Sequence, residues 1–361
     1  MSELRQLVLY VSPAWKRDLL HVPLLYPFWG NALSKEKTPF QWQLFEKYGF
    51  DTAYYRVTED IEEADMILMP YSHNHVVLYA PDILDLCQEA SCASGKPLLI
   101  DGIGDIERPV SVPNSIVIRY GGYRFLKQGN EIHIPPYADD LLELYCGGEL
   151  QLRHVQPKAS ISFAGWAQLT LKQELRVLIK EAPNRLHAIF DSRYGACKKG
   201  VFFRREAVEL LTRSTLVDSS ILVRNAYSGH RDTAQKSAED LRKDFVDNLL
   251  GSDFALDVRG DANASIRLFE ILSLGRVPVI LDTERNLPFS DRVDYSTFAL
   301  IVDFRDRAQL PQIIADFNNT LTDEKFIQMQ KAARDAYRNY FRVDALTAPL
   351  VREIWAKLAS L

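Results

Sequence analysis

Short apolar runs and amphipathic segments alternate along most of the chain. Apolar runs of about four to eight residues are typical of buried strands, whereas apolar positions that recur about every 3.6 residues are typical of helices. In the first half, strands are expected at residues 4–11, 52–57, 62–70, 96–101 and 114–119, and helices at residues 40–48 and 82–94. This alternation of strand and helix predicts an α/β fold built on a parallel sheet.

The same pattern begins again after a polar segment at residues 151–160, which contains Pro157 and is expected to link two domains. Beyond it, strands are expected at residues 161–164, 186–190, 252–256, 277–281 and 298–302, and helices at residues 171–180, 238–250, 266–274 and from residue 322 onward. We therefore predict two α/β domains at residues 1–155 and 156–335, followed by a helical segment at residues 336–361.

Length and composition narrow the class of protein. The 361 residues fit two α/β domains, and 47% hydrophobic with 25% charged residues is typical of a folded chain. A net charge of −5 gives no reason to expect a nucleic-acid partner. The cysteines lack the spacing of a zinc site and are expected to be reduced thiols. Without a signal peptide or an apolar run of about 20 residues, we expect a cytoplasmic protein with no transmembrane segment, and peripheral membrane contact stays open.

Residues 252–289 carry the most informative chemistry. A strand is followed by a loop with Arg259 and Gly260, and Ser265 is then well placed to cap a helix that stops at Gly275. A helix that begins after a strand presents free N–H groups and a partial positive charge at the carboxyl edge of the sheet. This is the edge at which a phosphate-bearing ligand is expected.

Arg267 and Glu270 strengthen this interpretation. A cation in the first turn of a helix opposes the helix dipole, so Arg267 makes sense there if an anion faces it. Glu270 lies three residues further on the same face, and a carboxylate can accept hydrogen bonds from two ribose hydroxyls. The pair therefore suits a nucleotide-diphosphate sugar. The alternative is an ordinary surface ion pair between Arg267 and Glu270.

The spacing of particular residues within this segment adds a resemblance. The positions are Ser252, Phe254, Leu256, Arg259, Gly260, Ser265, Arg267, Glu270, Gly275, Pro278, Val279, Ile280, Leu287, Pro288 and Phe289. In this set, the chain resembles the exostosin family of glycosyltransferases. Weaker similarity to the family occurs at residues 64–65, 69–71, 133–136 and 162–165. The chain departs from the family pattern at Ala255 and Val277, where the family has cysteine.

The resemblance implies a GT-B fold, in which two Rossmann-like domains face each other across a cleft. It implies a nucleotide-sugar donor in the C-terminal domain, a glycan or lipid-linked glycan acceptor at the N-terminal domain, and a C-terminal helix that crosses back to the latter. The implied reaction is an inverting transfer, with a UDP-sugar favoured as donor. No Asp-x-Asp motif occurs, so we expect neither metal ion nor cofactor, and stabilisation of the phosphates by arginine and the helix dipole.

An inverting transfer needs a base that takes the proton of the acceptor hydroxyl. It should lie on a loop at the carboxyl edge of the N-terminal sheet. Asp101 and Asp105 follow one expected strand, and His73 and His75 follow another. Asp105 is the first choice because it lies on a glycine-containing loop. Each of these residues could instead cap a helix, stabilise a turn or face solvent.

Two further arginines are candidates for the donor site. Arg204 belongs to a basic cluster with Arg205, Lys198 and Lys199, and Arg231 lies in a polar loop of the second domain. Both are expected to reach the phosphates of the donor. A solvated basic face is the alternative for the cluster.

Two other functions fit parts of the sequence. The chain could be a catalytically silent partner that binds a sugar nucleotide or a glycan within a glycosyltransferase complex, although the presence of both Arg267 and Glu270 argues against this. A nicotinamide oxidoreductase would need a glycine-rich fingerprint. Gly102 and Gly104 begin such a pattern, but Glu107 stands in place of the third glycine, so a plain turn is favoured.

Overall fold

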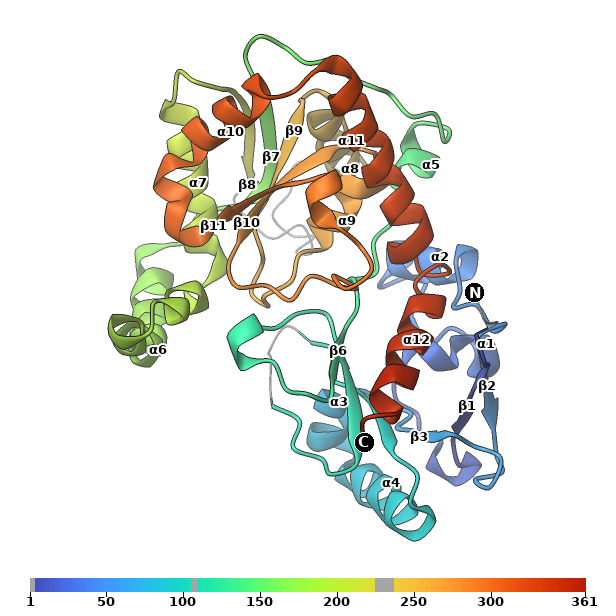
Figure 1. The fold of residues 1–361 in the computed structure, drawn as a ribbon. Coiled ribbons are helices and arrows are strands. Elements are labelled where there is room, and N and C mark those ends of the chain that lie inside the picture. Colours follow the sequence, from blue (N-terminus) through green and yellow to red (C-terminus); the bar gives the residue numbers. More distant parts are fainter. Residues whose placement is uncertain (1–3, 105–108, 225–236) are drawn as a thin grey trace.

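Two parallel sheets form the framework of this computed structural model, which describes residues 4–104, 109–224 and 237–361 (Figure 1). The first sheet has the order β2-β1-β3-β4-β5-β6 and the second the order β11-β10-β9-β7-β8. All of their strand pairs are parallel. Helices pack on both sheets. The hydrophobic core of the first sheet continues to Leu268, Phe269 and Ile280 in the second half of the chain, and a separate core packs on the second sheet. This arrangement confirms the predicted GT-B fold of two Rossmann-like domains.

The strands follow the apolar runs of the sequence. They are β1 (Leu7–Tyr10), β2 (Tyr55–Thr58), β3 (Met66–Leu68), β4 (Leu98–Asp101), β5 (Ser115–Arg119) and β6 (Glu131–His133) in the first sheet, and β7 (Ser160–Trp166), β8 (Asp218–Arg224), β9 (Phe254–Asp257), β10 (Val277–Asp282) and β11 (Leu300–Asp303) in the second. Every residue of β4, β5, β9 and β10 is buried. Continuous apolar runs are expected here because helices cover both faces of a parallel sheet.

The helices fill the connections between these strands. They are α1 (Tyr26–Trp29), α2 (Pro39–Lys47), α3 (His73–Tyr79), α4 (Pro81–Ser94), α5 (Leu141–Tyr145), α6 (Leu171–Phe190), α7 (Gly200–Arg213), α8 (Ala238–Leu250), α9 (Ile266–Ser273), α10 (Leu310–Asn319), α11 (Asp323–Ala336) and α12 (Thr347–Leu358). In the described part of the chain, no helix is both long enough and apolar enough for a membrane span.

One predicted strand is wrong. Residues 186–190 form the last turns of α6, which begins with a capping box of Thr170 and Gln173 and continues past Pro183. Short apolar runs do not distinguish a strand from a helix, so the pattern alone was ambiguous there. The real neighbour of β7 at the edge of the sheet is β8, in which less buried and exposed residues alternate. The apolar pattern predicted neither β8 nor β6.

The C-terminal helix α12 lies against the first sheet, on the opposite domain from α11 (Figure 1). Leu350, Val351 and Ile354 are buried in the same hydrophobic core as the first sheet. Trp355 donates from Nε1 to the carbonyl of Arg5 at 3.0 Å. The chain thus returns to the first domain at its end. The exact domain limits given above stay predictions.

Candidate functional site

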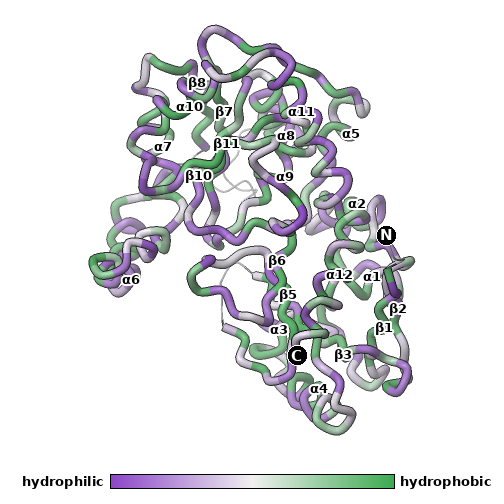
Figure 2. The backbone as a smooth tube through the Cα atoms, viewed as in Figure 1, coloured by the Kyte–Doolittle hydropathy of each residue, from purple (hydrophilic) through white to green (hydrophobic). Residues whose placement is uncertain are grey.

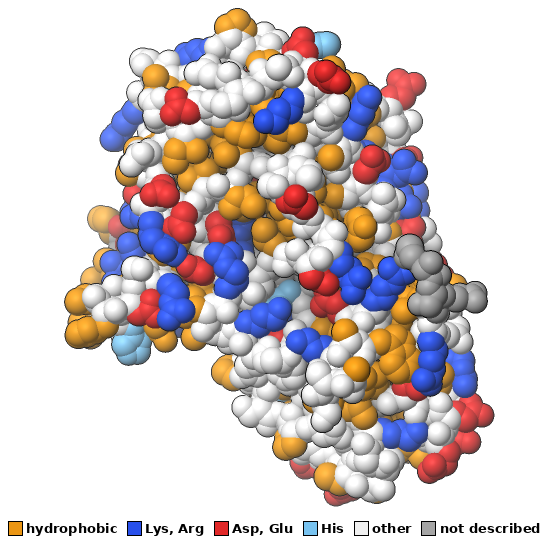
Figure 3. All heavy atoms as spheres, viewed as in Figure 1, with side chains coloured by type: hydrophobic (Ala, Val, Ile, Leu, Met, Phe, Trp, Pro, Cys, Tyr) orange, Lys and Arg blue, Asp and Glu red, His pale blue; other side chains and the backbone are white. Residues whose placement is uncertain are grey.

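The loops at the carboxyl edges of the two sheets meet in the middle of the molecule. Gly122 follows β5, whereas Asn263 and Asn286 follow β9 and β10. The carbonyl of Gly122 accepts hydrogen bonds from the backbone of Asn286 at 3.1 Å and from Nδ2 of Asn263 at 3.2 Å. Ligands of open α/β sheets bind outside the carboxyl ends of the strands. The space-filling view shows a hollow beside this junction, with basic side chains around it (Figure 3).

Gly121 permits the close approach of the two edges. A Cβ atom on this residue would lie 2.6 Å from the carbonyl oxygen of Asn263 and 2.9 Å from the Cβ of Ala264. Both neighbours belong to the loop that precedes α9. Any larger residue would therefore push the loops of the two domains apart.

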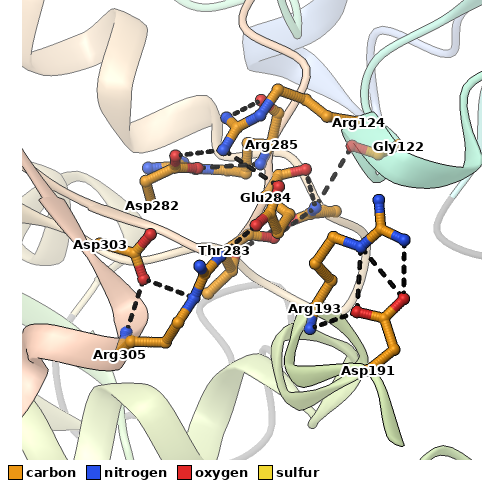
Figure 4. A network of polar contacts seen from close by, with 11 residues as sticks. Gly122, Arg124, Asp191, Arg193, Asp282, Thr283, Glu284, Arg285, Asp303 and Arg305 are labelled. Atoms are coloured by element: carbon orange, nitrogen blue, oxygen red, sulfur yellow. Dashed lines mark hydrogen bonds and ion pairs between the residues drawn. The ribbon is translucent and has the colours of Figure 1, made fainter. Parts of the chain in front are cut away.

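Arg124 forms a polar contact with the loop after β10 in the second domain (Figure 4). Its guanidinium binds the carboxylate of Asp282 at 2.8 Å, the carboxylate of Glu284 at 3.2 Å and the carbonyl of Arg285 at 2.8 Å. Its backbone N–H donates to the carbonyl of Glu284 at 2.8 Å. Arg124 was not among the residues predicted from the sequence. The available signal was the glycine pair just before it, since two glycines after a buried strand favour a close backbone approach.

The start of α9 rests on a buried polar pair. Ser265 occupies the N-cap position, but its hydroxyl donates to Oδ1 of Asp257 at 2.5 Å and does not cap the helix. The expectation of a Ser265 cap was therefore wrong. Asp257 also forms an ion pair with Arg285 at 2.8 Å, and both side chains are fully buried. At the other end, Gly275 has the positive φ of 64° that ends a helix, as predicted.

Arg267 lies at the same edge, between α9 and β7. Its Nη2 donates to the carbonyl of Ala164 at 2.7 Å, and its guanidinium stands 4.7 Å from the centre of the Phe163 ring. A Cβ on Gly165 would come within 2.4 Å of Nη2. The glycine in β7 therefore makes room for this cation, and stacking on an aromatic ring fixes its direction.

Glu270 is held by an arginine that the sequence analysis did not name. Arg242 of α8 binds its carboxylate at 2.5 Å and that of Asp139 at 2.9 Å. Although burial opposes the charge, these two carboxylates raise the pKa of Arg242 above its ordinary value. Glu270 is itself buried. A ribose would therefore meet a carboxylate that Arg242 already orients.

Arg259 points into the protein. Only 1% of its surface is exposed, and its guanidinium donates to the carbonyls of Ala196 at 2.9 Å, Asp261 at 3.2 Å and Lys198. The side chain thus holds the loop after β9 against the segment before α7. Its predicted contact with phosphate stays a prediction, because nothing in these contacts tests it.

Arg204 supports the same loop from α7. It donates to the carbonyls of Val258 at 3.2 Å and Trp166 at 3.4 Å. Gly260 lies beside Gly200, the first residue of α7, where a Cβ would come within 2.2 Å of the Gly260 carbonyl. The structure thus brings Arg204 of α7 against the loop after β9, which contains Arg259, Gly260 and Ser265. Arg231 lies outside the described residues.

The base candidates follow strands of the first sheet. Asp101 ends β4 and is buried, and the N–H of Ile103 donates to its Oδ1 at 2.8 Å. Burial raises the pKa of Asp101 to about 7. His73 begins α3, and its neighbour Asn74 reaches the carbonyl of Ile103 at 3.4 Å. The start of α3 at His73 therefore lies beside the segment that follows Asp101, whereas Asp105 lies outside the described residues.

His133 is a second titratable group at the junction that the sequence analysis did not name as a base. It ends β6 and is buried, 3.1 Å from the place of a Cβ on Gly122. Burial, reinforced by the positive charges of Lys127 and Arg119, lowers the pKa of His133 to about 3. Such a group stays neutral at physiological pH and is a weak proton acceptor.

Comparison with known proteins identifies residues 198–317 as an exostosin GT47 domain. An exostosin-1 homolog of Caenorhabditis elegans is 28% identical over 129 residues, which is 35% of this chain and 33% of that protein. The probable arabinosyltransferase ARAD1 of Arabidopsis thaliana is 29% identical over 108 residues, 30% of this chain and 24% of that protein. The chain thus matches a third or less of the length of these relatives.

Among solved structures, this chain is similar to the crystal structure of TarM. The match covers 76% of this chain and 58% of the TarM chain, at 10% identity and a TM-score of 0.30. A similarity this low adds nothing about the site. The matched domain, in contrast, contains Arg204, Arg259, Arg267 and Glu270. Residues 198–317 thus match the exostosin GT47 domain, and the candidate residues of the second domain lie within the matched part.

Proposed function

We propose that the chain transfers a sugar from a nucleotide-diphosphate sugar, with a UDP-sugar favoured, to a hydroxyl of a glycan or a lipid-linked glycan. One observation carries this proposal. The exostosin domain at residues 198–317 coincides with the loops and the helix start at the carboxyl edge of the second sheet, where that edge meets the first sheet. A location in the cytoplasm stays a prediction.

The leaving diphosphate would be stabilised by charge already in place. Arg267 is stacked on Phe163 at the start of α9, where the helix N-terminus adds a partial positive charge. A cation that is fixed before the reaction loses little energy to reorganisation as negative charge develops on the phosphates. Arg259, Arg204 and Arg231 would support this site. We therefore expect the reaction to proceed without a metal ion.

The acceptor side would supply the base and determine the stereochemistry. We propose Asp105 as the base, with Asp101 and His73 next to it in order of preference. The pKa of about 7 at Asp101 suits proton transfer near neutral pH. A single displacement from the first-domain side would invert the anomeric carbon, which the anomeric configuration of the product measures by NMR. Glu270 would hold the ribose, oriented by Arg242.

The test is the turnover of the Arg267→Ala variant against a panel of UDP-, GDP-, CMP-, ADP- and dTDP-sugars, with and without glycan acceptors. Removal of a preorganised charge at the reacting group costs about a hundredfold to a thousandfold in kcat. Arg292→Ala is the matched control, because Arg292 is partly exposed, pairs with the neighbouring carboxylate of Asp291 at 3.4 Å and takes no part in the candidate site. Equal turnover in wild type and Arg267→Ala would overturn the proposed role.

The same panel distinguishes an enzyme from a silent binding partner. A transferase releases nucleotide faster when the acceptor is present, and its rate is insensitive to EDTA if no metal takes part. A silent partner would show thermal stabilisation by a sugar nucleotide, since a ligand that binds the native state raises its stability, but no release of nucleotide with any acceptor.

A further inference from the structure

The helix α6 exposes its apolar side. Its large apolar residues follow a helical spacing of one, three, four or seven positions, and each of them is between 39% and 91% exposed. They are Leu171, Leu175, Leu178, Ile179, Leu186, Ile189 and Phe190. At about 100° per residue they cover one stripe of about a third of the helix circumference. In Figure 1 the helix stands out from the second domain, and Figure 2 shows its hydrophobic positions.

The opposite side of α6 attaches the helix to the protein through polar contacts. Glu174 forms an ion pair with Arg205 of α7. Glu181, the one buried residue of the helix, accepts the backbone N–H of Lys199 and pairs with Arg185 at 3.4 Å. An ordinary surface helix buries its apolar stripe and exposes its charges. In α6 this orientation is inverted.

Such an inversion indicates a binding surface. Seven of the 22 exposed large hydrophobic side chains in the described residues lie on this single helix of 20 residues. Contiguous apolar patches on a folded domain mark contacts with a partner or a membrane. At about 1.5 Å per residue, the stripe is about 30 Å long. A stripe of this length is much larger than a single exposed apolar side chain and is large enough for a docking surface.

The charges beside the stripe determine which partner fits. Lys172, Arg176 and Lys180 are exposed and lie four residues apart, so they form one row along the edge of the stripe. Both carboxylates of the helix, Glu174 and Glu181, are instead directed to partners on the protein. The helix therefore presents only positive charge around an apolar stripe, although the whole chain has a net charge of −5.

We propose that α6 lies flat on an anionic lipid bilayer, with its apolar stripe in the headgroup region and its row of cations on lipid phosphates. An interfacial helix combines an apolar face with flanking lysine and arginine in this way. Because the rest of the chain is acidic, an anionic surface would attract the protein at α6 and repel it elsewhere, which sets one orientation. A second copy of the chain would bring two rows of like charge close together. This proposal does not depend on the proposed transfer reaction.

Flotation of the full chain with vesicles tests the proposal. The probe is a vesicle of phosphatidylcholine with 30 mol% phosphatidylglycerol. We expect the chain to bind these vesicles and to bind vesicles of pure phosphatidylcholine at least tenfold more weakly. The variant Leu175→Gln/Ile179→Gln/Leu186→Gln should lose binding to both, with an unchanged melting temperature because these side chains are exposed. Leu144→Gln, which removes an exposed leucine from α5, is the matched control and should bind as wild type does.

Removal of the three positive charges distinguishes binding to an anionic lipid surface from binding to other partners. In Lys172→Gln/Arg176→Gln/Lys180→Gln, affinity for the anionic vesicles should fall about a hundredfold, at roughly fivefold for each cation, and the wild-type affinity should weaken with added salt. Equal binding to neutral and anionic vesicles would overturn the proposal. So would an absence of vesicle binding, in particular if the chain forms a dimer in solution that the leucine variant dissociates.

Discussion

Two aspartates at corresponding places in the two sheets have opposite surroundings. Asp101 ends β4 of the first sheet, and Asp257 ends β9 of the second. Both are buried. Asp257 faces the guanidinium of Arg285 at 2.8 Å, whereas Asp101 forms no ion pair within the described residues and accepts one backbone N–H. A buried carboxylate needs either a cation or a proton, and these two aspartates show one solution each.

The groups around the two aspartates show the same difference. Near Asp101 lie Tyr26, Tyr120 and Tyr137, and burial raises the pKa of each of these phenols, so the surroundings of Asp101 are neutral and rich in hydroxyl groups. The edge near Asp257 instead combines arginines with carboxylates. A neutral, hydroxyl-rich edge favours a sugar, and a charged edge favours a phosphate ligand. The difference supports the proposed division between acceptor and donor.

The largest expected effect is at Asp101. With a pKa of about 7 in the folded state and 3.8 ordinarily, the folded protein keeps a proton that the unfolded chain releases between these two values. Wild-type stability should therefore fall as the pH rises from about 4 to 7, and stay low above. Asp101→Asn mimics the protonated acid. We expect it to match wild type near pH 4 and to be more stable by about 4 kcal/mol at pH 8.

Urea unfolding of both proteins across this pH range measures the difference. Burial also raises the pKa of Glu353 to about 7, but that group contributes equally to both proteins and cancels. A constant difference between Asp101→Asn and wild type at all pH values would contradict the assignment of the proton to Asp101.

The same substitution at Asp257 should have the opposite sign. Asp257→Asn leaves the guanidinium of Arg285, which is 2% exposed, without its counter-charge. Removal of one partner of a buried ion pair costs about 3 to 5 kcal/mol, and we expect about 3 because asparagine still accepts the Ser265 hydroxyl. Thermal unfolding measures the loss.

Asp303 at the end of β11 is the control for this variant. Its ion pair with Arg305 at 3.0 Å is partly exposed, so Asp303→Asn should change the unfolding free energy by less than about 1 kcal/mol. If both variants lost the same amount, burial of the Asp257 pair would not explain the effect.

The sequence predicted the region around β9 and α9 in the second domain well for a physical reason. The strand before Asp257, the helix α9 and the turn at Gly275 are defined by local apolar runs and by backbone conformation. The same local pattern was ambiguous at residues 186–190, where the apolar residues continue α6 and never reach a sheet. The inverted orientation of α6 depends on tertiary contacts, which periodicity does not reveal.

The partners of the candidate residues could not be predicted. Arg242 binds Glu270 from another helix, and Arg124 reaches Asp282 across 158 positions of the chain. Such pairs can be identified only once the fold is known. The sequence did place Arg267 at the start of a helix after a strand, and the structure shows it there, stacked on a ring from β7 that no local pattern indicated.

A single added methyl group should disrupt the contact between the carboxyl edges of the two sheets. In Gly121→Ala, the added methyl group would lie 2.6 Å from the carbonyl oxygen of Asn263, so the loops must move. Overpacking of this kind costs about 2 kcal/mol. Gly129→Ala is the matched control, because nothing lies within 4 Å of a Cβ there. We expect a clear fall in melting temperature for the first variant and almost none for the second. Equal melting temperatures would show that the edges can separate freely.

Arg124→Ala should have the smallest effect, although Arg124 makes more polar contacts between the domains than its neighbours do. Its side chain is 45% exposed, so water screens the ion pairs to Asp282 and Glu284, and we expect a loss of about 1 kcal/mol that decreases with added salt. Urea unfolding at low and high ionic strength measures it. A loss above about 3 kcal/mol that is independent of salt would mean that the charged edge is as well shielded from water around Arg124 as around Asp257. Ion pairs would then stabilise the junction more than the backbone contacts at Gly121 and Gly122 do.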